Sequence, residues 1–147
     1  MANTCVNENS FIEKMGYDQK NDKNIKGKVA FGKNNDVDAY ISVDGHFEYK
    51  NRFYLLEIDS GNEAKLLAGQ YILLNALYDK VQCNGYAIKD VVFLVIHYYD
   101  SYNPERTEKT LKAIKDRYKT DMQYMAFHQK DINNWDDLLA KIEIKSN

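Results

Sequence analysis

Apolar residues recur at every second position in parts of the first half of the chain, which predicts β-strands there. The pattern covers residues 28–31, 37–43 and 52–59. Strand side chains alternate in direction, so each segment has one mainly apolar face. The stretch VDGHFEYKNR, between the second and third segments, contains the Asp-Gly and Lys-Asn pairs that are typical of hairpin connections. We therefore expect the second and third strands to pair antiparallel as a hairpin.

Elsewhere, apolar residues lie three and four positions apart, which predicts helices. The predicted helices cover residues 10–17, with Ser10 as the cap, and residues 62–78, 104–118 and 133–142. The run VVFLVIHYY at 91–99 is typical of a parallel strand that is buried on both faces. Together with the strand and helix before it, this run predicts a right-handed crossover unit. A last strand is predicted at 122–128.

The predicted order of elements is αβββαβ followed by αβα, which indicates an α/β fold with a mixed central sheet flanked by helices on both sides. The chain has 147 residues, the usual size of one domain, and no change of composition marks a linker. We expect a single domain over residues 1–147. Its core would cover about 10–99, and the last helix, strand and helix, at about 104–147, would be accessory.

Composition and charge narrow the classes of function. With 44% apolar and 29% charged residues, the chain has the composition of a soluble globular protein. The net charge of -2 argues against a generally basic nucleic-acid-binding surface, although lysines at 20, 23, 26, 28 and 33 make the N-terminal third locally basic. The longest apolar run is far shorter than the roughly 20 residues that cross a bilayer, and the N-terminus does not resemble a secretory signal. We expect a cytoplasmic protein with no membrane segment and with Cys5 and Cys83 as free thiols.

Three acidic residues carry the candidate chemistry. Glu57 and Asp59 end the strand RFYLLEID on one face, with Ile58 on the other, and Asp38 lies opposite the apolar face of the preceding strand. If the two strands pair, these carboxylates converge at one end of the sheet. Carboxylate oxygens suit magnesium, which can activate water and stabilise charge on a phosphate. Lys65, at the start of the next helix, could add a fixed positive charge.

Simpler interpretations stay open for these residues. Single acidic residues of this kind are more often solvated charges, and only their joint placement favours a metal site. Asp36 competes with Asp38, but it falls in a KNND turn, where aspartate commonly caps the turn, so we prefer Asp38. The three histidines have no paired spacing for zinc, and we expect each to be structural or exposed.

In order and spacing, these residues resemble the PD-(D/E)XK nuclease superfamily, which includes many restriction enzymes, RecB-like and VRR-type nucleases and resolvases. Its αβββαβ core carries an aspartate on the second strand and (D/E)-x-K on the third. Here NNDVDAYISV supplies Asp38 and LLEID supplies Glu57. The resemblance covers residues 10–99, about two-thirds of the chain.

The resemblance implies a restriction-endonuclease-like core and an endonuclease that hydrolyses phosphodiester bonds with Mg²⁺ or Mn²⁺. It implies a nucleic acid substrate, with DNA preferred over RNA, and a homodimer would let two sites address two strands. The implied metal ligands are Asp38, Glu57, the main-chain carbonyl of Ile58 and, on the first helix, Glu13. Gln70, in AGQYILLNALY, matches a glutamine that some RecB-like and VRR-type members carry near the site.

One position departs from the pattern of this superfamily. The lysine expected two residues after Glu57 is Asp59. Some members carry Glu or Gln there or place the lysine on the next helix, so Lys65 could stand in for it, with Asp59 as a third acidic ligand or as a replacement for the lysine. The alternatives are a nuclease-fold binding or inhibitor module without catalysis and an unrelated α/β domain whose acidic residues coincide by chance.

Overall fold

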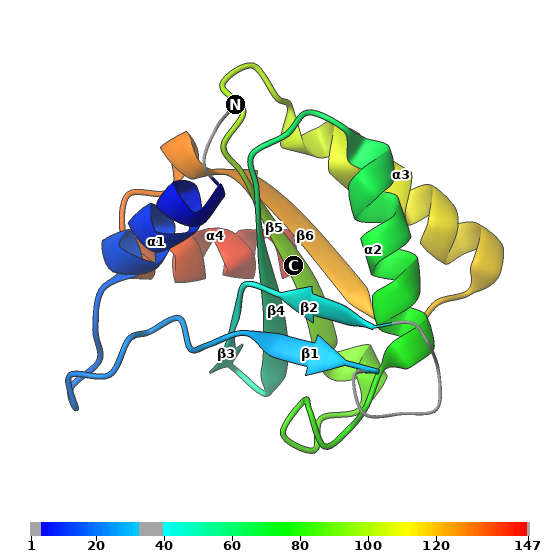
Figure 1. The fold of residues 1–147 in the computed structure, drawn as a ribbon, viewed down its shortest axis with the longest axis horizontal. Helices are drawn as coiled ribbons and strands as arrows, with labels where there is room; N and C mark the ends of the chain where they lie inside the picture. The colour runs from blue at the N-terminus through cyan, green and yellow to red at the C-terminus, as the bar shows by residue number, and fades with distance from the viewer. Residues whose placement is uncertain (1–3, 33–39, 147) are drawn as a thin grey trace.

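The computed structural model describes residues 4–32 and 40–146 of the chain. Helices and strands follow one another along these residues as Figure 1 shows. Their bounds are α1 Thr4–Met15, β1 Val29–Phe31, β2 Ile41–Val43, β3 Gly45–Tyr49, β4 Arg52–Asp59, α2 Ala64–Leu77, the short 3-10 helix η1 Ile88–Asp90, β5 Val91–His97, α3 Pro104–Tyr118, β6 Gln123–His128, η2 Gln129–Asp131 and α4 Trp135–Ser146.

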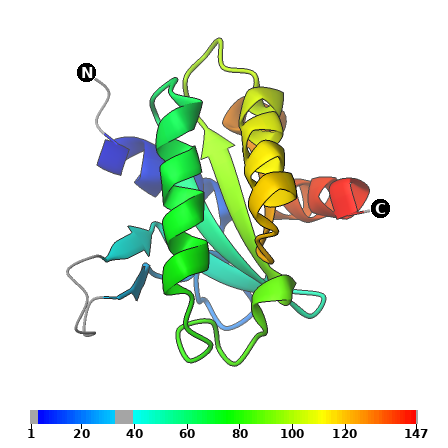
Figure 2. The same cartoon turned by 90° about the vertical axis from the view of Figure 1, so that its right-hand side faces the viewer.

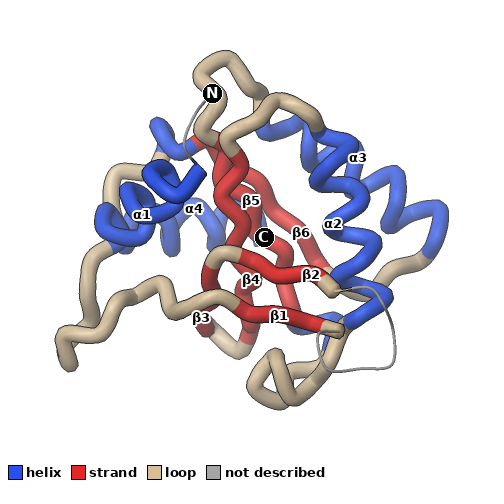
Figure 3. Tube along the Cα trace, in the orientation of Figure 1, coloured by secondary structure: helices blue, strands red, loops and turns tan. Residues whose placement is uncertain are grey.

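A mixed four-stranded sheet forms the centre of the molecule, with the strand order β3-β4-β5-β6 (Figure 3). β3 is antiparallel to β4, whereas β4, β5 and β6 are parallel to one another. All of β5 is buried, as its apolar run predicts, because helices cover both faces of the sheet. The predicted parallel pairing of the strands around α2 is confirmed.

Helices cover the two faces of the sheet as separate layers. α2 and α3 lie side by side over one face, and α1 and α4 cover the other (Figures 1 and 2). The alternation along β4 decides which residues meet which layer: Phe53 and Leu55 pack toward α2 and α3, whereas Tyr54, Leu56 and Ile58 pack toward α1 and α4. Burial of each such side chain contributes about 1.5–3 kcal/mol. The predicted α/β class, with helices on both sides of a mixed sheet, is confirmed.

The predicted hairpin between the second and third strands is wrong in its pairing. β2 pairs with β1, not with β4, in a separate two-stranded sheet, and β3 is the antiparallel partner of β4. The Lys50-Asn51 pair does form the tight turn between β3 and β4, with φ of 48° and 63° at its two residues. The Asp-Gly pair is instead a bend between β2 and β3 within one extended segment.

Packing against Gly45 explains this bend. A β-carbon at Gly45 would lie 2.7 Å from Ile25 Cγ2 and 2.8 Å from the Lys26 carbonyl oxygen. Only glycine lets the two backbones approach so closely, because it has no side chain. The glycine of the Asp-Gly pair therefore serves a tertiary contact rather than a chain reversal.

Other boundaries follow the sequence closely, with one exception. The helix predicted at 104–118 is found as α3, and the side chain of Asn103 caps it by accepting from the Glu105 amide at 3.0 Å. Ser10 is not the cap of the first helix, because α1 begins at Thr4 and Ser10 lies inside it. Among the described residues, no helix is long and apolar enough to cross a membrane.

Candidate functional site

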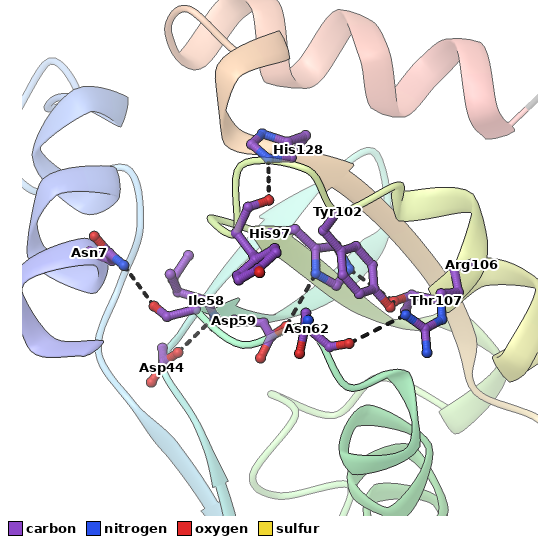
Figure 4. A network of polar contacts seen from close by, with 12 residues as sticks. Asn7, Asp44, Ile58, Asp59, Asn62, His97, Tyr102, Arg106, Thr107 and His128 are labelled. Carbon is purple, nitrogen blue, oxygen red and sulfur yellow. Dashed lines mark hydrogen bonds and ion pairs between the residues drawn. The ribbon is translucent and has the colours of Figure 1, made fainter. Parts of the chain in front are cut away.

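The acidic residues gather where β4 ends, at the same edge of the sheet as the carboxyl ends of β5 and β6. Ligands of α/β proteins commonly bind at this edge of parallel strands. Glu57 and Asp59 lie on the β4 face that carries Phe53 and Leu55, as the alternation predicts. The N-terminal helix α1 also reaches this edge, because Asn7, labelled in Figure 4, donates to the Ser60 hydroxyl at 2.7 Å just after β4 ends.

Glu57 is the most unusual group in the site. Its Oε1 is inaccessible to solvent and has no hydrogen-bond partner among the described residues. Burial and, next, the nearby carboxylates of Asp44 and Asp59 raise the pKa of Glu57 to about 8, although the Gln70 side chain opposes the shift. Glu57 is thus a carboxyl group held among other acids, and no lysine or arginine of the described residues is among the groups that shift its pKa.

Asp44 supplies the second carboxylate of the site. It lies in the bend between β2 and β3, where its Oδ2 accepts from the Ile58 amide at 2.7 Å (Figure 4). This bond fixes Asp44 against β4, one residue before the end of the strand. Its charge contributes to the raised pKa of both Glu57 and Glu8.

Sequence reasoning missed Asp44 because its Asp-Gly pair looks like a turn. A signal was present, since ISVDGHFEY keeps apolar residues or glycine at every second position from Ile41 to Tyr49. Such continuous alternation indicates one extended segment. This interpretation makes Asp44 a strand residue whose side chain points away from the apolar positions.

The acidic residue of α1 that approaches the site is Glu8, not Glu13. The side chain of Glu8 is 15% exposed and pairs with Lys28 at 3.9 Å. Its pKa is raised, chiefly by burial and next by the charge of Asp44, while Lys28 lowers it. Glu13 is exposed, because five residues rotate a helix by about 140° to another face.

Asp59, which stands where the resemblance expects a lysine, is held by a buried histidine. Nδ1 of His97 lies 3.2 Å from Asp59 Oδ2, and His97 is fully buried. The sheet register places the two residues side by side on β4 and β5. No local pattern predicts this pair, because neighbours on parallel strands are set by tertiary structure.

The other predicted site residues are placed differently. Gln70 on α2 reaches Glu57. Lys65 is exposed near the start of α2 and is not among the groups that shift the pKa of Glu57. The side chain of Ile58 packs on the opposite face of the sheet. Asp38, together with Asp36, lies outside the described residues.

The donor atoms at this site suit a hard cation bound with water. In residues 4–32 and 40–146, no three His, Cys, Asp or Glu side chains converge closely enough to enclose a metal ion. Magnesium does not require such a cage, since it is commonly held by one or two carboxylates and keeps several waters. Asp44 and Glu57 offer two carboxylates, and the unpartnered Oε1 of Glu57 is an acceptor that such an ion would satisfy.

Comparison with models of known protein families and with curated proteins finds no match to this chain. Function is therefore inferred from the residues of the site.

Proposed function

We propose that this protein is a metal-dependent nuclease of the PD-(D/E)XK type that hydrolyses phosphodiester bonds of nucleic acid. The observation that carries the proposal is the buried, unpartnered Oε1 of Glu57 beside the carboxylate of Asp44. Two neighbouring acids destabilise the folded chain once both are ionised, and no lysine or arginine of the described residues is among the groups that shift the pKa of Glu57. Such an arrangement at the carboxyl edge of a parallel sheet is typical of a site that binds a cation.

The order of elements supports the same proposal once β2 and β3 are taken as one bent strand. Residues 41–49 are then the second strand of an αβββαβ core, β4 is the third, and α2 and β5 follow. Asp44 falls on the second strand and Glu57 on the third. Asp44 thereby takes the role that the sequence suggested for Asp38.

Each residue has a distinct role in this proposal. Asp44 and Glu57 hold the cation, with Glu8 close enough to Asp44 to bind a water of the same shell. A cation held there would supply an activated water and would stabilise charge on the phosphate. Gln70 orients water beside Glu57, and the exposed ammonium of Lys65 is available to a substrate phosphate rather than to the metal.

A cleavage assay tests the proposal. The purified chain is incubated with single- and double-stranded DNA, and in parallel with RNA, in Mg²⁺, in Mn²⁺ and in chelator. We expect metal-dependent cleavage, with DNA preferred, that falls by about 100-fold or more in Glu57→Gln and in Asp44→Asn, since each removes a metal-binding carboxylate. Asp137→Asn, on α4, is the matched surface control and should cleave as the wild type does.

Two outcomes would overturn the proposal. One is a folded wild-type protein that cleaves none of these substrates in either metal. The other is cleavage that survives both Glu57→Gln and Asp44→Asn, which would assign the activity to a contaminant or to another site.

A further inference from the structure

A series of side-chain hydrogen bonds connects the acidic site to the start of α3. From Asp59 it passes through His97 to Thr107, where His97 Nε2 lies 3.0 Å from Thr107 Oγ1. Thr107 Oγ1 in turn lies 2.7 Å from the Tyr102 hydroxyl. The rings of His97 and Tyr102 stack with centroids 4.1 Å apart and planes 16° apart. Figure 4 shows these side chains converging between β4, β5 and α3.

The chemistry of these groups decides which atom donates and which accepts in each of these hydrogen bonds. An ionised Asp59 can only accept, so Nδ1 of His97 must donate to it. In the neutral imidazole Nε2 then accepts, so the Thr107 hydroxyl donates to Nε2 and accepts a hydrogen bond from the Tyr102 hydroxyl. Both ring nitrogens of His97 and both hydroxyl groups have partners, and the Tyr102 ring stacks on the His97 ring. The result is a carboxylate whose Oδ2 is held in one orientation.

His128 shows that this arrangement is specific to His97. The two histidines are register neighbours on β5 and β6, and both are buried. His128 Nε2 donates to the Tyr99 carbonyl at 2.8 Å, and its Nδ1 accepts from the Lys130 amide at 3.2 Å. These partners are main-chain groups, so His128 stabilises the local fold. His97 instead bonds two side chains, one of which is an acid of the candidate site.

We propose that His97 is a positioning residue that holds Asp59 as an outer-shell acceptor for water bound at the Asp44–Glu57 site. The inference rests on the proposed function. Among the described residues none donates to Asp59 Oδ1, so this oxygen is available to water while His97 occupies Oδ2. Outer-shell groups that orient a carboxylate in this way are typical of metal sites.

Replacement of His97 tests the proposal with two readouts, calorimetric affinity for Mn²⁺ and steady-state cleavage. His97→Phe keeps an aromatic ring against Tyr102 but removes the donor to Asp59. We expect about tenfold weaker Mn²⁺ binding and a lower kcat with KM for nucleic acid unchanged. His97→Asn, whose amide can replace Nδ1 as donor, should recover most of the affinity, and His128→Phe should leave it unchanged.

Thr107→Val provides a milder variant in case His97→Phe does not fold. It removes the hydroxyl that donates to Nε2 with little change in volume, and it should weaken Mn²⁺ binding in the same direction by a smaller factor. The proposal is overturned if folded His97→Phe or Thr107→Val binds Mn²⁺ as the wild type does, or if His128→Phe weakens binding equally. If the wild type neither binds Mn²⁺ nor cleaves, the proposed function itself fails, and this inference fails with it.

Discussion

Two acidic residues of this protein, Asp137 on α4 and Glu57 on β4, have opposite surroundings. Asp137 accepts from Lys141 at 2.7 Å and from the Asn133 amide at 2.8 Å, and these bonds hold its pKa below the usual value. Glu57 lies among other carboxylates, and burial and their charges raise its pKa to about 8. The first arrangement stabilises the folded chain in neutral solution, whereas the second opposes folding once Glu57 ionises.

This difference indicates which acid belongs to a site. A protein has many ways to neutralise a buried glutamate, and a lysine two residues further along β4 would be one. Here that position is Asp59, which adds another negative charge near Glu57. Buried acids that lower the stability of the folded chain in this way are expected where a ligand supplies the missing interaction.

The largest expected effect is a loss of stability as pH rises. The folded pKa of Glu57, about 8, lies above the ordinary value of 4.5, so the folded state binds a proton that the unfolded state has released. The stabilisation from this proton is fully present below pH 4.5 and is lost as pH rises through about 8. The free energy of unfolding should fall by about 2 kcal/mol between pH 6 and pH 8.5.

Urea denaturation at a series of pH values measures this loss. Glu57→Gln, which cannot ionise, should remove most of the pH dependence above pH 6. Asp137→Asn should not change it, because Asp137 is already ionised in this range. An unchanged slope in Glu57→Gln would place the titrating group elsewhere.

A somewhat smaller effect is expected from the cation. At pH 8.5, Mg²⁺ or Mn²⁺ at ten times its Kd should raise the free energy of unfolding by about 1.4 kcal/mol, because only the folded chain assembles the site. Thermal unfolding with and without the metal measures it. Asp44→Asn and Glu57→Gln should lose the response, whereas Asp137→Asn should keep it. Equal stabilisation of all four proteins would indicate non-specific binding.

Asp44→Asn should also lower the pKa of Glu57, because it removes a neighbouring negative charge. A carbon-detected NMR titration of the glutamate side chains measures the pKa directly. The variant should titrate below the wild-type value of about 8 while keeping the bond to the Ile58 amide, since the asparagine oxygen still accepts. A Glu57 pKa that does not move would mean that the two carboxylates do not interact.

The smallest effect is expected at Asp137 itself. Asp137→Ala removes the Lys141 pair and the bond to the Asn133 amide. A modest loss of stability should follow that is independent of Mg²⁺ and that shrinks as pH falls, because its ordinary pKa of 3.8 is lowered in the folded state. Thermal unfolding at pH 7 and at pH 3 measures it. If Asp137→Ala lowered the free energy of unfolding as much as the ionisation of Glu57 does, the contrast between the two acids would not hold.

The sequence predicted those features that depend on neighbouring residues. The helix at 104–118, the buried run that becomes β5 and the shared face of Glu57 and Asp59 follow from local periodicity. The resemblance predicts Gln70 beside the site, and its side chain is close enough to Glu57 to oppose the rise of its pKa.

What the sequence could not predict depends on contacts between distant segments. The Asp-Gly pair looks like a turn until Ile25 and Lys26 are seen to pack on Gly45, and for this reason the predicted pairing of the strands is wrong. Glu8 was overlooked because α1 begins six residues earlier than Ser10 suggests. His97 meets Asp59 only through the register of β4 and β5.

A crystal of the protein soaked in Mn²⁺ gives the most direct test of the central claim, that Asp44 and Glu57 together bind a divalent cation. We predict an anomalous peak at about 2.0–2.3 Å from carboxylate oxygens of both residues, with water completing the coordination. A crystal without such a peak, or one in which Glu57 Oε1 is bonded to a protein group instead, would contradict the claim.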